Sequence, residues 1–267
     1  MYAFNYHAPK TVRQAATLLA KNEDGKVLAG GQTLLPTMKQ RLASPSALID
    51  LNHAEGMSGI EQKGRNIVIG AMTRHADVAT SAVVKNALPA LAALAGGIGD
   101  PAVRNRGTIG GSIANNDPAA DYPSAVLALG ATIVTNKRKI AADDFFQGMF
   151  ATALEEGEII VKVSFPIPSK AAYEKFPNPA SRYALVGVFV AKKGADVRVA
   201  VTGAGSNGVF RSKECEAALA ARFNAKSLDG VKVSASGLNA DMHASADYRA
   251  HLIPVMAKRA VDKALAK

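Results

Sequence analysis

Two glycine pairs, each next to a small hydroxyl side chain, are the residues of this sequence best suited to hold a phosphate group. Gly30 and Gly31 lie between a hydrophobic run and Thr33, and Gly110 and Gly111 lie between Thr108 and Ser112. Paired glycines let the backbone approach a ligand closely, and neighbouring N–H groups can donate to phosphate oxygens. Either pair alone is more often a tight turn. The two pairs together favour a dinucleotide site in which both loops hold a pyrophosphate.

A third glycine motif, Gly203-x-Gly205-x-x-Gly208, has the spacing of a Rossmann fingerprint. A Rossmann site needs a parallel strand–helix–strand unit and an acidic residue about 20 positions further on. The strand expected before Gly203 belongs to an antiparallel hairpin, and no clear strand ending in an acidic residue follows. We therefore interpret this motif as a flexible turn and not as a nucleotide site.

No set of catalytic or metal-binding residues emerges from the remaining side chains. Ser112 has no histidine at a diagnostic spacing, and the five histidines show no ligand spacing and are mostly expected to face solvent. The single cysteine, Cys215, is expected to be a partly buried helical residue; alone it cannot form a disulfide, a cysteine zinc site or an iron–sulfur cluster. Any redox role therefore needs an organic cofactor. Asp117 and Asp121 could cap the helix that follows them or belong to the site.

Composition narrows the class of protein further. The chain has 267 residues, 48% of them apolar and 20% charged, with a net charge of +10, so a sizeable core is expected. No signal peptide and no apolar run of membrane-spanning length is evident, which favours a cytoplasmic protein. The positive charge could serve nucleic acid, an anionic cofactor or an acidic partner. Its densest run, residues 137–139, is typical of a solvated turn, and no aromatic residues are interleaved with it, which argues against nucleic acid.

Hydrophobic periodicity predicts the elements that position these loops. Strands are expected at 27–29, 47–51, 131–135 and 159–165, a hairpin across 60–69, and helices at 34–42, 76–95 with a break at Pro89, and 124–129. Four prolines within 166–180 and little periodicity there indicate a domain boundary. Beyond it, the pattern predicts a hairpin of strands 183–191 and 197–201 and helices at 213–223 and 248–266.

Two long segments resemble the FAD-binding medium subunits of molybdenum hydroxylases, the group of xanthine dehydrogenase and aerobic carbon monoxide dehydrogenase. They are residues 27–36, VLAGGQTLLP, and residues 104–121, RNRGTIGGSIANNDPAAD. Residues 144–150, DFFQGMF, point to the carbon monoxide dehydrogenase branch. The resemblance implies an α+β fold: a p-cresol methylhydroxylase-type FAD-binding domain over 1–170, with two α/β subdomains of about 1–52 and 53–170. A C-terminal domain of antiparallel sheet and helices would follow over 171–267.

The resemblance also implies FAD, bound non-covalently between the two glycine loops. The loops would hold pyrophosphate and ribityl groups, Ile98 would lie against the isoalloxazine, Ile160 would line the adenine end, and Asp121 would contact the cofactor. Gln32 stands where carbon monoxide dehydrogenase subunits often have histidine, and a lysine that touches FAD in some relatives aligns near Asn178, with Lys175 as an alternative. The implied cofactor-binding residues are Val27, Leu28, Ala29, Gly30, Gly31, Gln32, Thr33, Leu34, Ile98, Thr108, Ile109, Gly110, Gly111, Ser112, Asp121 and Ile160.

By the same resemblance, the chain is expected to be an electron-transfer subunit of an oxidoreductase. A large molybdenum-cofactor subunit would oxidise the substrate, and a small subunit with two-iron–two-sulfur clusters would pass electrons to FAD here and on to an external acceptor, in a dimer of heterotrimers. One alternative is a self-contained flavin oxidase or dehydrogenase of the same fold; such enzymes commonly tether FAD to a histidine and carry a larger substrate domain. Another is a non-catalytic scaffold or nucleic-acid binder.

Overall fold

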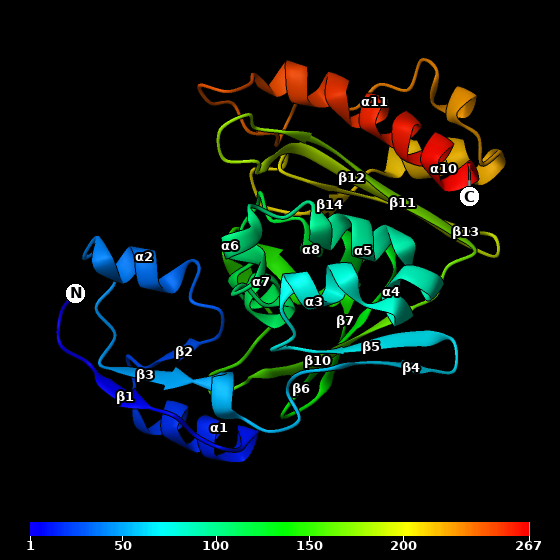
Figure 1. The fold of residues 1–267 in the computed structure, drawn as a ribbon. Helices are drawn as coiled ribbons and strands as arrows, with labels where there is room; N and C mark the ends of the chain where they lie inside the picture. The colour runs from blue at the N-terminus through cyan, green and yellow to red at the C-terminus, as the bar shows by residue number, and fades with distance from the viewer. Residues whose placement is uncertain (267) are drawn as a thin grey trace.

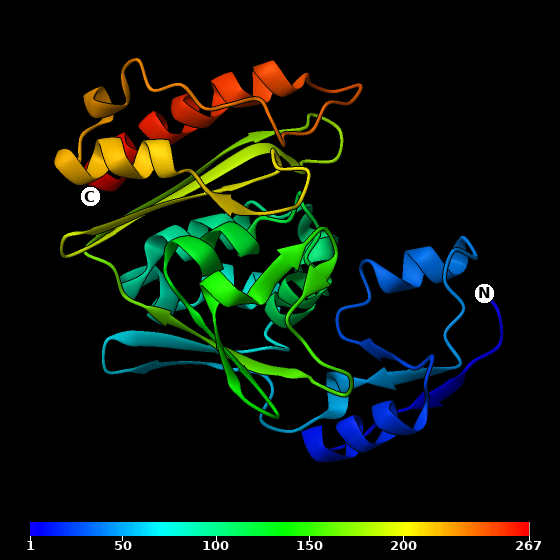
Figure 2. The same ribbon diagram turned by 180° about the vertical axis from the view of Figure 1, so that it is seen from behind.

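Three larger β-sheets follow one another along the chain in the computed structural model, which describes residues 1–266. In Figure 1 the N-terminal sheet lies to one side of the molecule, and the other two sheets lie above and below a layer of helices. Figure 2 shows the same arrangement from behind. The mixture of a small parallel sheet, two antiparallel sheets and separate helices is the expected α+β class.

The N-terminal unit is a three-stranded parallel sheet in the order β1-β3-β2. Its first helix begins after Thr11, whose side chain accepts a hydrogen bond from the Gln14 N–H, which satisfies one of the unpaired donors of the first turn. Its elements are β1 (Asn5–His7), α1 (Val12–Lys21), β2 (Lys26–Leu28), α2 (Leu34–Lys39), β3 (Ala47–Asp50) and the short 3₁₀ helix η1 (Leu51–His53). The first glycine loop is the connection between β2 and α2.

The central sheet is antiparallel, in the order β4-β5-β10-β6-β7. Its strands are β4 (Ile60–Lys63), β5 (Asn66–Gly70), β6 (Thr132–Thr135), β7 (Lys139–Ala141) and β10 (Ile160–Pro166). The helices above it are α3 (His75–Thr80), α4 (Ala82–Ala87), α5 (Pro89–Gly96), α6 (Pro101–Arg104), α7 (Ile109–Asn115), α8 (Tyr122–Ala128) and α9 (Ala142–Phe145), followed by the hairpin β8 (Phe146–Gly148) and β9 (Ala151–Thr152). The segment 76–95 is interrupted at Ser81, which caps α4, as well as at Pro89.

The C-terminal sheet is antiparallel, in the order β11-β12-β13-β14, and lies between two layers of helices (Figure 1). Its strands are β11 (Lys170–Pro177), β12 (Ala184–Lys193), β13 (Asp196–Thr202) and β14 (Phe210–Arg211); its outer helices are α10 (Lys213–Ala221), the 3₁₀ helix η2 (Ala225–Leu228) and α11 (Ala246–Leu265). The other face of the sheet packs on α5 and α8. The stretch 166–180, where the sequence indicates a domain boundary, contains the strand β11, which the hydrophobic pattern did not predict.

The packing corrects one smaller expectation. Cys215 is completely buried in the core between α10 and the C-terminal sheet, and not partly buried. Within residues 1–266, no helix is long and apolar enough to cross a membrane.

Candidate cofactor site

The two glycine loops, far apart in the sequence, meet backbone to backbone. A Cβ atom built on Gly30 would lie 2.3 Å from the carbonyl oxygen of Arg106 and 2.6 Å from Cα of Gly107. A Cβ atom on Gly111 would lie 3.3 Å from Cβ of Ala29. A side chain at position 30 would therefore force the loops apart, which explains why glycine is needed there.

The first loop presents unpaired backbone donors. Among residues 1–266, no protein group accepts a hydrogen bond from the backbone N–H of residues 30, 31, 32 or 33. Gly31 has a positive φ of 71°, and Gln32 and Thr33 are exposed. Successive amide groups in a turn that includes a left-handed residue form a concave site for an anion. This loop fits the pyrophosphate of a dinucleotide.

The second loop differs from the sequence-based expectation, because its backbone donors are already used. The N–H groups of Ile109 and Gly110 donate to the carbonyl oxygens of Thr73 (3.1 Å) and Ala71 (2.8 Å). The Gly111 N–H donates to Oγ1 of Thr108 at 3.2 Å, and the Ser112 N–H donates to the Thr108 carbonyl oxygen at 3.0 Å. The prediction that these amides are available to phosphate oxygens was wrong. The polar group this loop retains is the half-buried Ser112 hydroxyl, which contacts no hydrogen-bonding partner within the described chain.

The segment that links β5 to α3 holds the second loop in shape. Besides the carbonyl groups of Ala71 and Thr73, the His75 N–H donates to the Gly107 carbonyl oxygen at 3.0 Å. Glycine is needed at positions 107 and 110, which lie against this segment. A Cβ atom on Gly107 would lie 2.5 Å from Nε2 of His75, and one on Gly110 would lie 2.5 Å from Cβ of Ala71.

His75 is buried, contrary to the expectation that the histidines mostly face solvent. Only 5% of it is exposed, and its ring lies 5.3 Å from that of Tyr122, measured between centroids. Burial, assisted by the nearby charge of Arg104, lowers the pKa of His75 to about 4. The imidazole is therefore neutral at neutral pH and supports the loop by packing against Gly107.

Asp121 is a buried carboxylate held by the C-terminal sheet. It precedes α8 without capping it, since its side chain accepts hydrogen bonds from the Tyr173 hydroxyl and from Nζ of Lys175, which lies 3.0 Å from Oδ1. Burial raises the pKa of Asp121, while the Lys175 charge and the hydrogen bonds oppose the rise. The alternative that Asp121 caps the helix was wrong. Asp117 does not cap it either, and accepts the Ala119 N–H in its own turn.

Lys175 also joins Asp121 to the loop that contains Ile98. Its Nζ donates to the carbonyl oxygen of Gly97 at 2.8 Å, so one ammonium group connects α8 to residues 97–99. Asn178 does something different. Its Oδ1 accepts the N–H groups of Ala180 and Ser181 within its own turn. Of the two residues considered for a cofactor contact, Lys175 is the one that faces this loop.

Ile160, at the start of β10, is buried and belongs to the same apolar core as Ile109 and Ile113 of α7. The next residue, Val161, accepts the Ala71 N–H at 2.9 Å, and Ala71 in turn accepts the Gly110 N–H. Two hydrogen bonds therefore connect the start of β10 to the second glycine loop. The structure thus places 27–34, 108–112 and 160 in one contiguous region, and His75 with Tyr122 links that region to Asp121.

The third glycine motif follows β13, an antiparallel strand, as expected. It is a packed loop and not a freely exposed turn, because Asn239 Nδ2 donates to the carbonyl oxygens of Gly203 and Gly205 and the Gly203 N–H donates to Pro118. No group of three or more histidine, cysteine or acidic side chains within residues 1–266 is arranged to hold a metal ion.

Comparison with known proteins identifies the region that contains both glycine loops. Residues 2–168 match the family model described as the FAD binding domain in molybdopterin dehydrogenase. The chain is 37% identical to the carbon monoxide dehydrogenase medium chain of Hydrogenophaga pseudoflava, covering 99% of this chain and 98% of that one. It is also 37% identical to the nicotine 6-hydroxylase medium subunit of Paenarthrobacter nicotinovorans, with the same coverage. A solved structure of the Hydrogenophaga carbon monoxide dehydrogenase superposes with a TM-score of 0.86 over 99% of this chain and 98% of that chain.

Proposed function

Since the chain belongs to the family of FAD-binding domains in molybdopterin dehydrogenases, we propose that it is the subunit through which electrons leave a molybdenum hydroxylase, carried on non-covalently bound FAD. The observation that supports this best is the contact between the two glycine loops, with four consecutive unpaired amides on the first. A pyrophosphate is the part of FAD that needs such donors.

We assign the proposed contacts by position in this site. The amides of residues 30–33 would donate to the pyrophosphate, and Ser112 would add a hydroxyl group. Ile98 would lie against the isoalloxazine, and the start of β10, at Ile160, would border the adenine. The side chain of Asp121 is directed to Tyr173 and Lys175, so its effect on the cofactor would come through the position of Lys175 and the Gly97 loop.

FAD, when bound, accepts electrons and passes them on, which this set of side chains cannot do alone. The residues of the chain bind and orient it. No catalytic acid or base is needed, because electron entry does not require proton transfer by a side chain. His75 is held neutral behind Gly107, so that it adds no charge beside the loop.

The relatives are named as medium chains or subunits of larger complexes, so other subunits exist. We propose a large molybdenum-binding subunit and a small iron–sulfur subunit, assembled as a dimer of heterotrimers in the cytoplasm, with a carbon monoxide dehydrogenase-like activity. The two-domain division at 170/171 is part of this proposal. It is supported by the sheets, because β10 ends at Pro166 and the C-terminal sheet begins at Lys170.

Absorbance of the purified chain tests the proposal. We expect bound flavin that is released by acid, and restoration of the spectrum when FAD is added back. A colourless protein that fails to bind added FAD would contradict the proposal. Flavin that stays attached after denaturation would favour the self-contained oxidase, in which the cofactor is tethered.

A further inference from the structure

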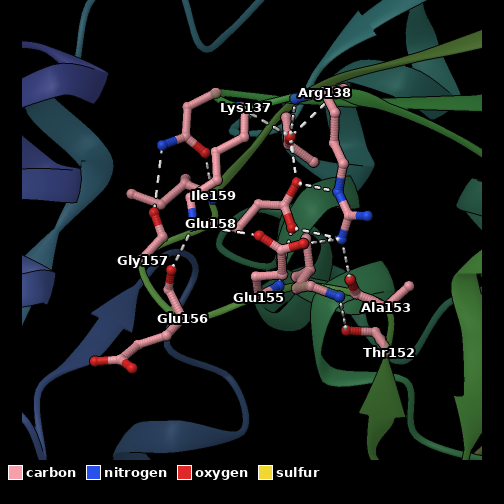
Figure 3. A network of polar contacts seen from close by, with 12 residues as sticks. Lys137, Arg138, Thr152, Ala153, Glu155, Glu156, Gly157, Glu158 and Ile159 are labelled. Atoms are coloured by element: carbon pink, nitrogen blue, oxygen red, sulfur yellow. Dashed lines mark hydrogen bonds and ion pairs between the residues drawn. The ribbon is translucent and has the colours of Figure 1, made fainter.

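The basic run at residues 137–139 is exposed, as expected of a solvated turn, but Lys137 and Arg138 also contact the loop before β10. Figure 3 shows the Arg138 side chain pointing toward Glu158, Glu155 and Ala153. Its Nε and Nη2 each donate to a different oxygen of Glu158 at 3.1 Å, and Nη2 also donates to the Ala153 carbonyl oxygen at 2.7 Å. Such two-point guanidinium–carboxylate pairing fixes orientation as well as distance.

The Glu158 carboxylate is fully enclosed by these contacts. Its side chain has no exposed surface. Beyond Arg138 it accepts the Thr135 hydroxyl at 2.6 Å and the Glu155 N–H at 2.9 Å. These four hydrogen bonds outweigh the effect of burial and lower the pKa of Glu158 to about 2. A buried carboxylate with this many donors is strongly oriented, and loss of one donor leaves part of its charge unpaired.

The turn between β6 and β7 also forms hydrogen bonds with the backbone on both sides of Glu158. The side chain and backbone of Asn136 form two hydrogen bonds with the backbone of Ile159, through the Ile159 N–H (2.8 Å) and its carbonyl oxygen (3.0 Å). Asn136 Nδ2 contacts the Gly157 carbonyl oxygen, and Lys137 Nζ donates to that of Glu156 at 2.8 Å. Residues 156–159 are therefore held at every position (Figure 3).

This held segment leads directly into the candidate cofactor site. Ile160 follows Ile159, and the Val161 carbonyl oxygen accepts the Ala71 N–H that begins the connection to Gly110. The strand β10 departs from regular pairing with β6 between Ile160 and Lys162. Ile160 itself pairs with Thr135, and because the ladder is irregular after it, this pair and the contacts that precede it hold Ile160 in place.

We propose that Arg138 and Glu158 are positioning residues for the adenosine half of the cofactor: their ion pair fixes residues 156–160 so that the start of β10 presents a preformed border to the adenine. Neither side chain contacts the cofactor. The inference rests on the proposed function and adds to it a part of this chain that the glycine loops do not include.

The two halves of FAD provide the test. Binding of ADP and of FMN to the full chain, freed of its cofactor, is measured by calorimetry for the unmodified protein, Arg138→Met and Glu158→Gln. We expect the ADP dissociation constant to rise at least about tenfold, the equivalent of about 1.4 kcal/mol, while FMN binding changes less than about twofold. Arg138→Lys, which keeps the charge but loses the two-point geometry, should give an intermediate ADP affinity and serves if the other variants do not fold.

A matched ion pair in the C-terminal domain is the control. Arg211 holds the largely buried Glu216 in the same two-point way, with Nε–Oε1 and Nη2–Oε2 distances of 2.6 and 3.0 Å. Arg211→Met should lower the melting temperature without changing ADP affinity. The inference is refuted if folded Arg138 variants bind ADP like the unmodified chain, or if Arg211→Met weakens ADP binding equally. Failure of the unmodified chain to bind FAD at all would instead refute the proposed function.

Discussion

Replacing Gly30 with alanine tests the contact between the two glycine loops by adding one methyl group. The new Cβ atom would lie 2.3 Å from the Arg106 carbonyl oxygen and 2.6 Å from Cα of Gly107. Both of these neighbours are backbone atoms, so no side-chain rotation can relieve the overlap. The loops must move apart by roughly 1 Å before the methyl group reaches ordinary van der Waals distance.

The free-energy cost of this overlap is expected to equal that of overpacking a protein core. Forcing an extra carbon into a packed position costs about 1–3 kcal/mol. If the loops stay together, the free energy of unfolding falls by this amount. If they separate, the first loop is no longer placed against the second before FAD binds, and the same energy appears as an affinity loss of about 5–150-fold.

Both quantities are measurable on the same protein. FAD affinity is obtained by fluorescence quenching of added flavin, and stability by urea denaturation of the cofactor-free chain. Gly96→Ala is the matched control, because a Cβ atom at Gly96 meets only Cβ of Ala79 at 3.8 Å. If Gly30→Ala matches Gly96→Ala in both affinity and stability, the close loop contact is not present in solution and the reasoning is wrong.

Three further predictions concern Lys175, His75 and Gly205. Lys175→Met should lower the free energy of unfolding by about 3 kcal/mol, because Asp121 loses a buried partner, whereas Lys263→Met, which breaks an exposed ion pair, should cost under about 1 kcal/mol; equal losses in urea denaturation would contradict this. His75 has a folded pKa of about 4, below its ordinary value, so stability should fall by about 3 kcal/mol as pH drops from about 6.5 to 4. A His75→Gln variant with the same pH slope would show that another group is responsible. Gly205→Ala should lower the melting temperature, because its Cβ atom would overlap backbone 2.4 Å away, yet leave FAD affinity within about twofold; a folded variant that loses FAD would restore the third glycine motif as a nucleotide site.

The glycine loops could be predicted from the sequence because the signal is local. Gly30 and Gly31 lie between a strand and a helix, and the order of residue types over six positions carries the information. Whether the backbone N–H groups of these loops are free or already hydrogen-bonded depends on residues far away in the sequence. The N–H groups of Ile109 and Gly110 donate to the backbone carbonyl oxygens of Thr73 and Ala71, more than thirty residues earlier. No side chain in that segment indicates this contact.

The strand β11 was missed for a different reason. A strand that is exposed on one face alternates apolar and polar residues, and this alternation is the signal that a sequence pattern detects. Ala172 and Tyr173 are adjacent and both buried, because α11 packs on one face of the C-terminal sheet and the α5 layer on the other. Flanking prolines then made the segment resemble a linker.

The basic run at residues 137–139 also shows that a local sequence pattern does not reveal distant partners. The sign of Lys137 and Arg138 is evident from the sequence, and a short basic run is most simply interpreted as solvated. The partner of Arg138, Glu158, is 20 residues away, and only the antiparallel pairing of β6 with β10 brings it beside Arg138. A pairing between strands, rather than a motif, decides whether such residues are surface charge or part of the framework.

The buried carboxylate of Asp121 shows that the region matched by the family model is not self-sufficient. That region ends at residue 168, but the two side chains that satisfy Asp121, Tyr173 and Lys175, both come from β11. Without them a carboxylate that is 5% exposed would have to accept a proton or draw in water, since an unpaired buried charge is costly. Loss of Lys175 would also remove its hydrogen bond to the Gly97 carbonyl oxygen, which supports the loop that carries Ile98. The C-terminal sheet therefore completes the proposed site from outside the matched region, and its first strand is the part that does so.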